Sequence, residues 1–215
     1  MPGAPTAVIF DCDGVLVDSE GLAWSAWRDA LAPHGVEVTQ ADVRDLTGRS
    51  EAEVYAAFGA RASLPPRHEL METVQSATLD RFAELPRFED ACGAAHELAS
   101  AGTPLGVASS SPRRRLSATL DAVGLGGMFD AVVAGDEVRH GKPAPDVYVR
   151  AAEALGVDPR RCLAVEDTSI GVAAALAAGM QVVAVRRGHV DPSSLGAATL
   201  VVDRVTASTL RRGVE

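Results

Sequence analysis

Two aspartates one residue apart follow the first apolar run of the chain. Asp11 and Asp13 come directly after VIF (8–10), and Gly14 follows them. Alternate side chains of a strand point to the same face, so an extended backbone would leave the two carboxylates side by side. Like charges at that distance repel unless something positive lies between them. The pair therefore favours a site that binds a cation and does nucleophilic or acid–base chemistry.

Polar residues also follow three later apolar runs. In chain order they are Ser109 and Ser110 after PLGVA (104–108), Lys142 beyond AVVA (131–134), and Glu166 and Asp167 after CLAV (162–165). The carboxyl ends of parallel strands meet at one edge of a sheet, so we expect these residues to share one site. Lys142 is the single lysine among 20 basic residues, which indicates a requirement for a compact ammonium group at that position.

The acidic residues predict a metal site and a reaction at phosphorus. Asp11, Glu166 and Asp167 are hard oxygen donors, which favour Mg²⁺ over Zn²⁺. Asp11 can act as a nucleophile, because a carboxylate can form an acyl phosphate and divide one difficult displacement into two easier ones. Asp13 would protonate the departing oxygen and later take a proton from the hydrolytic water.

A second group of residues is suited to hold an anion. Lys142, the hydroxyl of Ser109 and backbone N–H groups near Ser110 offer a cradle opposite the metal. Gly14 and Arg49 are further candidates for contact with the phosphate or with the rest of the substrate. A phosphoryl group fits such a cradle, so we expect the partner to be a small phosphorylated metabolite.

Six short apolar runs predict the strands that position these residues. They are residues 6–10, 104–108, 131–134, 162–165, 181–185 and 199–202. Continuous runs of this kind are typical of strands covered on both faces. Helix-like segments lie between them, and one begins with Ser111 as its N-cap, Pro112 as its first residue and Arg113, Arg114 and Arg115 on a solvated face. The alternation predicts an α/β fold with a doubly wound, parallel, Rossmann-like sheet.

One interval breaks this alternation. Residues 18–88 contain helical patterns and no convincing strand, and they are too many for a loop. The interval begins at the carboxyl end of the first strand, where open α/β sheets bind their ligands. We therefore expect an inserted all-helical cap domain at 18–88 and a Rossmann-like core domain at 1–17 and 89–215.

Composition narrows the class of protein. The chain has 215 residues, 47% of them hydrophobic, and a net charge of −9 with a pI near 5.0. A negative field of this size argues against nucleic acid or an anionic membrane as a partner, and no apolar run approaches the roughly 20 residues that cross a bilayer. We expect a cytoplasmic protein, with three reduced cysteines in its core. A monomer is favoured because the cap itself would cover the pocket.

Four motifs together resemble the haloacid dehalogenase (HAD) superfamily. They are FDCDGVLVDSE, VASSSP, GKPAPD and VEDTSIG, they occur in the order typical of that superfamily, and the resemblance covers about residues 6–190. It is specifically to the subgroup with a helical cap between the first two motifs. Within that subgroup the chain resembles phosphatases of sugar phosphates and other small phosphomonoesters, and β-phosphoglucomutases.

The resemblance also implies roles for particular residues. Asp11 would be the phosphoacceptor, and Asp13 the general acid/base and a metal ligand through its carbonyl. Ser109 and Lys142 would hold the phosphate. Asp167 would be a metal ligand, and Glu166 would bind the metal directly or through water.

Several activities of this superfamily can be weighed from the sequence. A dehalogenase has no use for Asp13, because halide leaves without a proton. Phosphonate hydrolases of this type use a cap lysine, and residues 18–88 contain none. A β-phosphoglucomutase would carry a cap histidine where Ala23 stands, as well as a cap lysine, so the residues favour water as the phosphoryl acceptor.

Two alternatives stay open at this point. One is phosphoryl transfer between sugar hydroxyls, and the other, from a different class, is a non-catalytic or phosphoacceptor signalling module. The segment RFEDA (87–91) also departs from the Pro-Gly pair of many relatives, so we expect the second hinge of the cap to be stiffer or differently placed. The function expected is a Mg²⁺-dependent phosphatase of a small organic phosphomonoester, acting through an aspartyl-phosphate on Asp11.

Overall fold

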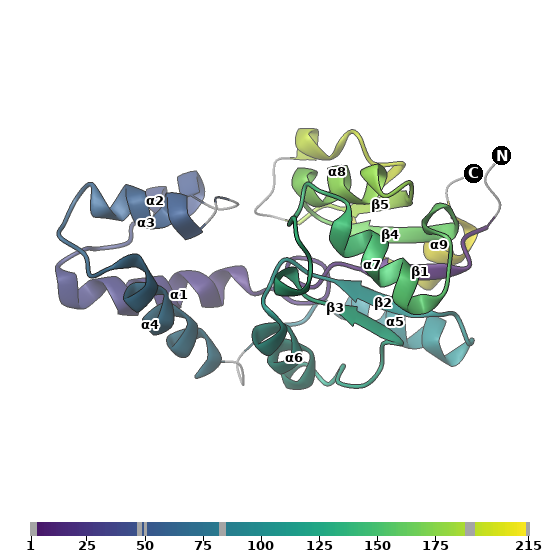
Figure 1. Cartoon of the computed structure of the whole chain (residues 1–215), viewed down its shortest axis with the longest axis horizontal. Helices are drawn as coiled ribbons and strands as arrows, with labels where there is room; N and C mark the ends of the chain where they lie inside the picture. Colours follow the sequence, from purple (N-terminus) through teal and green to yellow (C-terminus); the bar gives the residue numbers. More distant parts are fainter. Residues whose placement is uncertain (1–3, 47–48, 50, 82–84, 188–191, 214–215) are drawn as a thin grey trace. The chain divides into compact units, whose positions relative to one another are not determined.

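The chain forms two compact units in the computed structural model. The structure describes residues 4–46, 49, 51–81, 85–187 and 192–213. One unit comprises residues 1–18 and 86–215, and the other residues 19–85. We refer to them as the sheet unit and the helical unit (Figure 1).

The sheet unit is built on six parallel strands. They are β1 (Ala7–Phe10), β2 (Leu105–Ala108), β3 (Ala131–Val133), β4 (Cys162–Glu166), β5 (Gln181–Val185) and β6 (Leu200–Val202), in the order β3-β2-β1-β4-β5-β6. The central strand β1 pairs with β2 through Phe10 and Val107, and with β4 through Phe10 and Val165. Every residue of β1, β2 and β4 is buried, as expected of a sheet covered on both faces.

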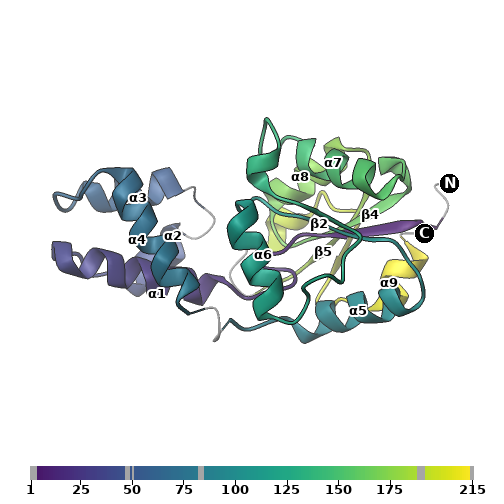
Figure 2. The ribbon, with the colours of Figure 1, turned by 60° about the horizontal axis from the view of Figure 1, so that its bottom comes forward.

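Helices cover both faces of this sheet. They are α5 (Glu89–Ser100), α6 (Arg113–Ala122), α7 (Asp146–Leu155), α8 (Ser169–Ala177) and α9 (Ala207–Arg212), with 3₁₀ turns at Gly135–Glu137, Pro159–Arg161 and Pro192–Leu195. Figure 2 shows α7 and α8 on one face and α5 and α9 on the other. The predicted doubly wound, parallel, Rossmann-like sheet is confirmed.

The helical unit consists of helices alone within its described residues. They are α1 (Glu20–Leu31), α2 (Gln40–Leu46), α3 (Glu51–Gly59) and α4 (Arg67–Leu79), with a 3₁₀ turn at Ala32–His34. Its core contains Trp27, Phe58, Leu70 and Val74, and the ring centroids of Trp27 and Phe58 lie 6.0 Å apart. The role of these helices as a cap domain stays a prediction.

The two crossings of the chain between the units pair with each other on the sheet-unit side. The N–H of Asp18 donates to the carbonyl of Pro86 at 2.9 Å, and the N–H of Phe88 donates to the carbonyl of Leu16 at 2.9 Å. No described helix has the length and apolar character needed to cross a membrane. All three cysteines are buried and free.

Candidate active site

Asp11 follows β1, the central strand of the sheet. Its backbone N–H donates to the carbonyl of Val165 at 2.9 Å, which extends the ladder with β4 by one residue. The side chain is buried, and burial is the main reason why the pKa of Asp11 lies well above its ordinary value. The charge of Lys142 opposes this rise, and the charges of Glu166 and Asp167 add to it. An added cation would favour the ionised carboxylate that a nucleophile needs.

Lys142 lies between two carboxylates. Its Nζ is 2.7 Å from Asp11 Oδ1 and 2.7 Å from Glu166 Oε1, and 6% of its side chain is exposed. Burial alone would lower the pKa of Lys142, but the charges of Asp11 and Glu166 together raise it well above its ordinary value. The ammonium group is thereby held charged next to Asp11.

Glu166 ends β4 and is fully buried, with hydrogen bonds to both of its oxygens. Oε1 accepts from Lys142 Nζ and, at 2.8 Å, from the hydroxyl of Tyr148. Oε2 accepts from the N–H of Asp167 at 3.0 Å, and from the N–H and hydroxyl of Thr168 at 3.2 and 3.1 Å. Burial would raise the pKa of Glu166, but Lys142 and these donors lower it. The carboxylate is therefore held ionised in one orientation.

Two glycines allow backbone to approach the carboxylates closely. A Cβ on Gly14 would lie 2.0 Å from Asp167 Oδ2, and a Cβ on Gly171 would lie 1.7 Å from Glu166 Oε1. Gly14 also has a φ of +84°, in the left-handed region. Gly14, predicted to contact phosphate or substrate, thus packs against Asp167.

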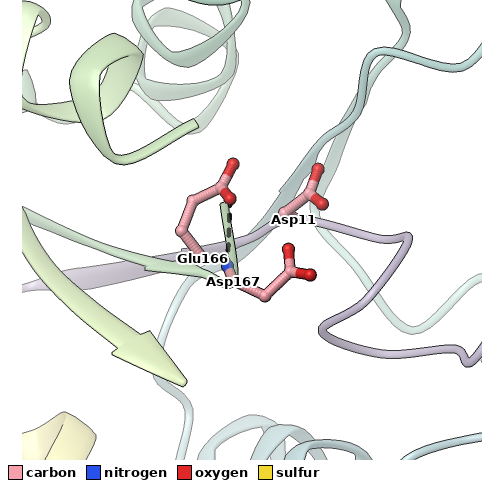
Figure 3. Close-up of side chains that lie close together, drawn as sticks. All are labelled: Asp11, Glu166 and Asp167. Atoms are coloured by element: carbon pink, nitrogen blue, oxygen red, sulfur yellow. Dashed lines mark hydrogen bonds between the residues drawn. The ribbon is translucent and has the colours of Figure 1, made fainter. Parts of the chain in front are cut away.

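The oxygens of Asp11, Glu166 and Asp167 converge (Figure 3), and one ligand atom from each lies within 4.8 Å of the others. All three residues are buried. When ionised they carry three negative charges against the single positive charge of Lys142, which leaves two. A divalent cation matches that excess, and carboxylate oxygens are the donors that Mg²⁺ prefers. The residues therefore fit a magnesium ion.

Asp13 is bound by two side chains at the start of α6. Ser111 Oγ donates to Asp13 Oδ2 at 2.9 Å, and Arg115 Nη2 donates to Asp13 Oδ1 at 3.2 Å. The N–H of Ser111 donates to Ser109 Oγ at 3.0 Å. Asp13 and Ser109 are thus linked through Ser111.

Two sequence interpretations of this segment were wrong. The residue before α6 is Pro112, whose ψ of 150° is extended, so Ser111 does not cap the helix and its hydroxyl binds Asp13. Arg115 is not on a solvated face, because 28% of its side chain is exposed and it pairs with Asp13. The helix begins one residue later than predicted, and residues on both sides of its start, Ser111 and Arg115, bind Asp13.

Two other predicted residues have no described contact with the carboxylates. Ser110 is exposed, and its backbone packs so closely against Gly135 that a Cβ there would lie 2.3 Å from the Ser110 carbonyl oxygen. Arg49 belongs to the helical unit, is exposed and pairs with Glu53 at 3.3 Å. The roles of Ser110 and Arg49 in binding phosphate or substrate stay predictions.

Sequence reasoning did not single out Tyr148 or Thr168. Thr168 caps α8, because its Oγ1 accepts from the N–H of Gly171 at 3.1 Å, and the same oxygen also donates to Glu166. A buried tyrosine is easily taken for core packing. For Tyr148, the available signal was its position six residues after Lys142, at the start of α7.

Known proteins resemble this chain over most of its length. The sequence model of the haloacid dehalogenase-like hydrolase family matches residues 8–185. Fructose-1-phosphate phosphatase YqaB of Escherichia coli K12 is 36% identical over 184 residues, which cover 83% of this chain and 95% of that protein. SUPPRESSOR OF QUENCHING 1, a chloroplastic protein of Arabidopsis thaliana, is 38% identical over 196 residues, which cover 86% of this chain but only 18% of the plant protein.

A solved structure supports the same relationship. A candidate β-phosphoglucomutase from Thermotoga maritima superimposes with a TM-score of 0.81 at 30% identity, over 95% of this chain and 96% of that one. These matches confirm the predicted superfamily and the predicted enzyme class, a phosphatase. The four motifs occur in the order typical of this family, and the parallel sheet brings their acidic and basic residues together. Because the family model also matches residues 8–185, the chain belongs to the haloacid dehalogenase-like hydrolase family.

Proposed function

We propose that this enzyme is a Mg²⁺-dependent phosphatase that hydrolyses a sugar or polyol phosphate through a phosphorylated Asp11. The observation that carries the proposal is the position of Lys142, whose Nζ bonds Asp11 beside a cluster of three buried carboxylates. The cluster is suited to a divalent cation and the lysine to a phosphoryl group. Asp11 belongs to both arrangements.

The first half of the reaction forms the phosphoenzyme. A carboxylate oxygen of Asp11 bonds to phosphorus as the P–O bond to the substrate alcohol breaks, and Asp13 gives its proton to the departing oxygen. Lys142 and the hydroxyl of Ser109 orient the transferred group. Mg²⁺, when bound, supplies positive charge that offsets the charge on that group.

The second half returns the enzyme to its starting state. Asp13 takes a proton from water, whose oxygen bonds to phosphorus while the bond to Asp11 breaks. Inorganic phosphate leaves, and Asp13 is again protonated for the next cycle. Asp11, Glu166 and Asp167, with the carbonyl of Asp13, are the residues that would hold the metal.

The class of substrate is supported by a relative. The match to fructose-1-phosphate phosphatase of E. coli covers 95% of that protein. A phosphorylated sugar or polyol is therefore the first substrate class to test. The second candidate function is the mutase reaction, which the Thermotoga structure favours. The sequence of the helical unit argues against the mutase reaction, because it has no lysine for a second phosphate and has Ala23 in place of a histidine.

The test compares wild type with Asp11→Asn in Mg²⁺. We expect phosphate release from p-nitrophenyl phosphate and from fructose 1-phosphate, lowered at least about 10³-fold in Asp11→Asn because the nucleophile is lost. Asp203→Asn is the matched control, since Asp203 is exposed and pairs only with Arg186 among the contacts described for it. Full activity in Asp11→Asn would rule out the phosphoenzyme. Conversion of β-glucose 1-phosphate into glucose 6-phosphate without phosphate release would favour the mutase.

A further inference from the structure

Arg187 lies outside the carboxylate cluster, yet its side chain is almost completely buried. It follows β5 by two residues, and 9% of its side chain is exposed. Arginine is rarely buried unless its charge and its N–H groups have partners. The partners of Arg187 therefore indicate what it is there to hold.

Two of these partners belong to the turn that follows β1. Arg187 Nε donates to the carbonyl of Gly14 at 3.2 Å, and Nη2 donates to the carbonyl of Val15 at 3.4 Å. Asp13 is the residue before Gly14, so the arginine binds the peptide groups next to the proposed acid/base.

The turn itself is closed by short backbone hydrogen bonds. The N–H groups of Leu16 and Val17 donate to the carbonyl of Cys12 at 2.9 and 3.1 Å, and the N–H of Gly14 donates to Val17 at 2.8 Å. The carbonyls of Gly14 and Val15 remain for Arg187. The arginine thus supplies donors from outside the turn.

The other side of the guanidinium group is anchored to the second chain crossing. Its Nη2 and Nη1 lie 3.1 and 3.4 Å from the two oxygens of Asp90, in the first turn of α5. Asp90 also accepts from the N–H of Val205 at 2.8 Å, and the guanidinium carbon lies 3.7 Å from the ring centroid of Phe88. This bidentate, stacked arrangement requires a planar guanidinium.

We propose that Arg187 is a positioning residue that fixes the turn from Cys12 to Val17 and, through it, Asp13. Gly14 makes this position critical, because its Cα lies so close to Asp167 that a Cβ would not fit. Any shift of the turn moves Asp13 and changes the contact with Asp167 at the same time. The expected effect on catalysis rests on the proposed function, whereas the expected effect on the conformation of the turn does not.

The neighbouring Arg186 provides a matched control. It pairs with Asp203 at 2.6 Å, but 42% and 82% of the two side chains are exposed. Exposed pairs of this kind contribute little to stability. The two arginines therefore differ in what they bind while sharing the same stretch of chain.

The first experiment measures hydrogen exchange in wild type, Arg187→Lys and Arg186→Lys without substrate. A lysine cannot reach both carbonyls and both oxygens of Asp90, so we expect the amides of Gly14, Leu16 and Val17 to exchange at least about fivefold faster in Arg187→Lys. The amides of β1 should keep their protection, and Arg186→Lys should match wild type. Unchanged exchange in the turn, or an equal rise in both variants, would overturn the proposal.

The second experiment measures kcat and KM on the folded enzyme, well below the melting temperature of each variant. We expect kcat of Arg187→Lys to fall about 10- to 100-fold, the loss typical when a group that orients a metal ligand is removed, with Arg186→Lys within about twofold of wild type. Asp90→Asn keeps the arginine but weakens its anchor, and it should lower kcat about threefold.

The outcomes separate a positioning role from a merely structural one. A structural arginine would lower the melting temperature of Arg187→Lys and leave kcat of the folded fraction unchanged, which would contradict the proposal. If Arg187→Lys does not fold, Asp90→Asn decides, and wild-type exchange and kcat in that variant would contradict it. If wild type itself releases no phosphate, the proposed function fails while the exchange experiment still tests the turn.

Discussion

Individual residues of the site are fixed by shared hydrogen bonds more than by their own conformational preferences. Tyr148 is an example, since it is fully buried on α7 and its hydroxyl donates to Glu166. Burial, followed by the charge of Glu166, raises the pKa of Tyr148 well above its ordinary value. The hydroxyl therefore stays protonated and remains a donor throughout the physiological pH range.

Removal of this hydroxyl is a direct test of its contribution. We expect Tyr148→Phe to lower the free energy of unfolding by about 1.5–3 kcal/mol, because a buried carboxylate loses a donor, and to lower kcat. Urea unfolding and phosphate release measure the two effects.

Tyr55→Phe is the matched control for that substitution. Tyr55 donates to the neutral carbonyl of Pro65 at 2.8 Å, so its loss should cost about 0.5–1.5 kcal/mol and leave kcat unchanged. Equal costs in both variants, with kcat unaffected in both, would show that the charge on Glu166 does not strengthen the bond from Tyr148.

At the scale of elements, α2 begins with a reciprocal arrangement around Asp42. Asp42 Oδ2 accepts from the N–H and the hydroxyl of Thr39 at 2.8 and 2.7 Å, and the N–H of Asp42 donates back to Thr39 Oγ1 at 3.2 Å. Arg61 also donates to both oxygens of this buried carboxylate. The hydrogen bonds from Arg61, followed by those from Thr39, hold the pKa of Asp42 well below its usual range.

This lowered pKa predicts a pH-dependent contribution to stability. The folded state favours the ionised form, so the stabilisation is fully present above the pKa of the unfolded chain, near 4, and is lost as pH falls toward the folded value. We expect Asp42→Asn to be about 1.5–3 kcal/mol less stable than wild type at pH 7, with the gap shrinking below pH 4. Urea unfolding across this pH range measures it.

An exposed aspartate of the same unit gives the comparison. Asp80 lies at the end of α4 and is exposed. The free energy of unfolding of Asp80→Asn should differ from that of wild type by less than about 0.5 kcal/mol, both at pH 7 and below pH 4. A pH-independent gap between wild type and Asp42→Asn would mean that Asp42 acts through its shape and not through its charge.

The elements were more predictable than the side-chain partners. All six strands lie within the expected apolar runs or extend them by one residue, because buried parallel strands need continuous apolar sequence. Strand ends alone were enough to place Asp11, Lys142, Glu166 and Asp167 near one another. The bonds of Ser111 and Arg115 to Asp13 were missed, because they depend on where Pro112 lets α6 begin.

Arg187 shows the same limit of prediction more sharply. Its partners on the turn after β1 and on α5 are about 170 and 97 positions away in the chain. Nothing in the spacing of residue types encodes the direction of one long side chain. Only the packed structure shows that the side chain of Arg187 is almost completely enclosed while that of its neighbour Arg186 is exposed.

At the scale of the whole molecule, the described residues form separate cores. One core surrounds Phe58 in the helical unit, and another includes Ile9, Tyr148 and Val182 in the sheet unit. These two clusters share no residue. A substitution that destabilises one core should therefore increase local unfolding first within its own unit.

Phe58→Ala tests this independence. We expect a loss of about 3–5 kcal/mol, because Phe58 is fully buried against Trp27. Hydrogen exchange should speed up in α1, α3 and α4, while the amides of β1 and β4 keep their protection. A uniform loss of protection over both units would show that they unfold together.

The central place of β1 has a consequence for how the protein is made. Val8 pairs with Leu105 and Leu163, which are synthesised only after about 100 and 155 further residues have been added. The contiguous segment of residues 19–85 can fold in the meantime, since the core residues described around Phe58 all belong to it. The strand that leads to Asp11 is thus made well before the strands it pairs with, so the site stays incomplete on the ribosome until β4 has been synthesised.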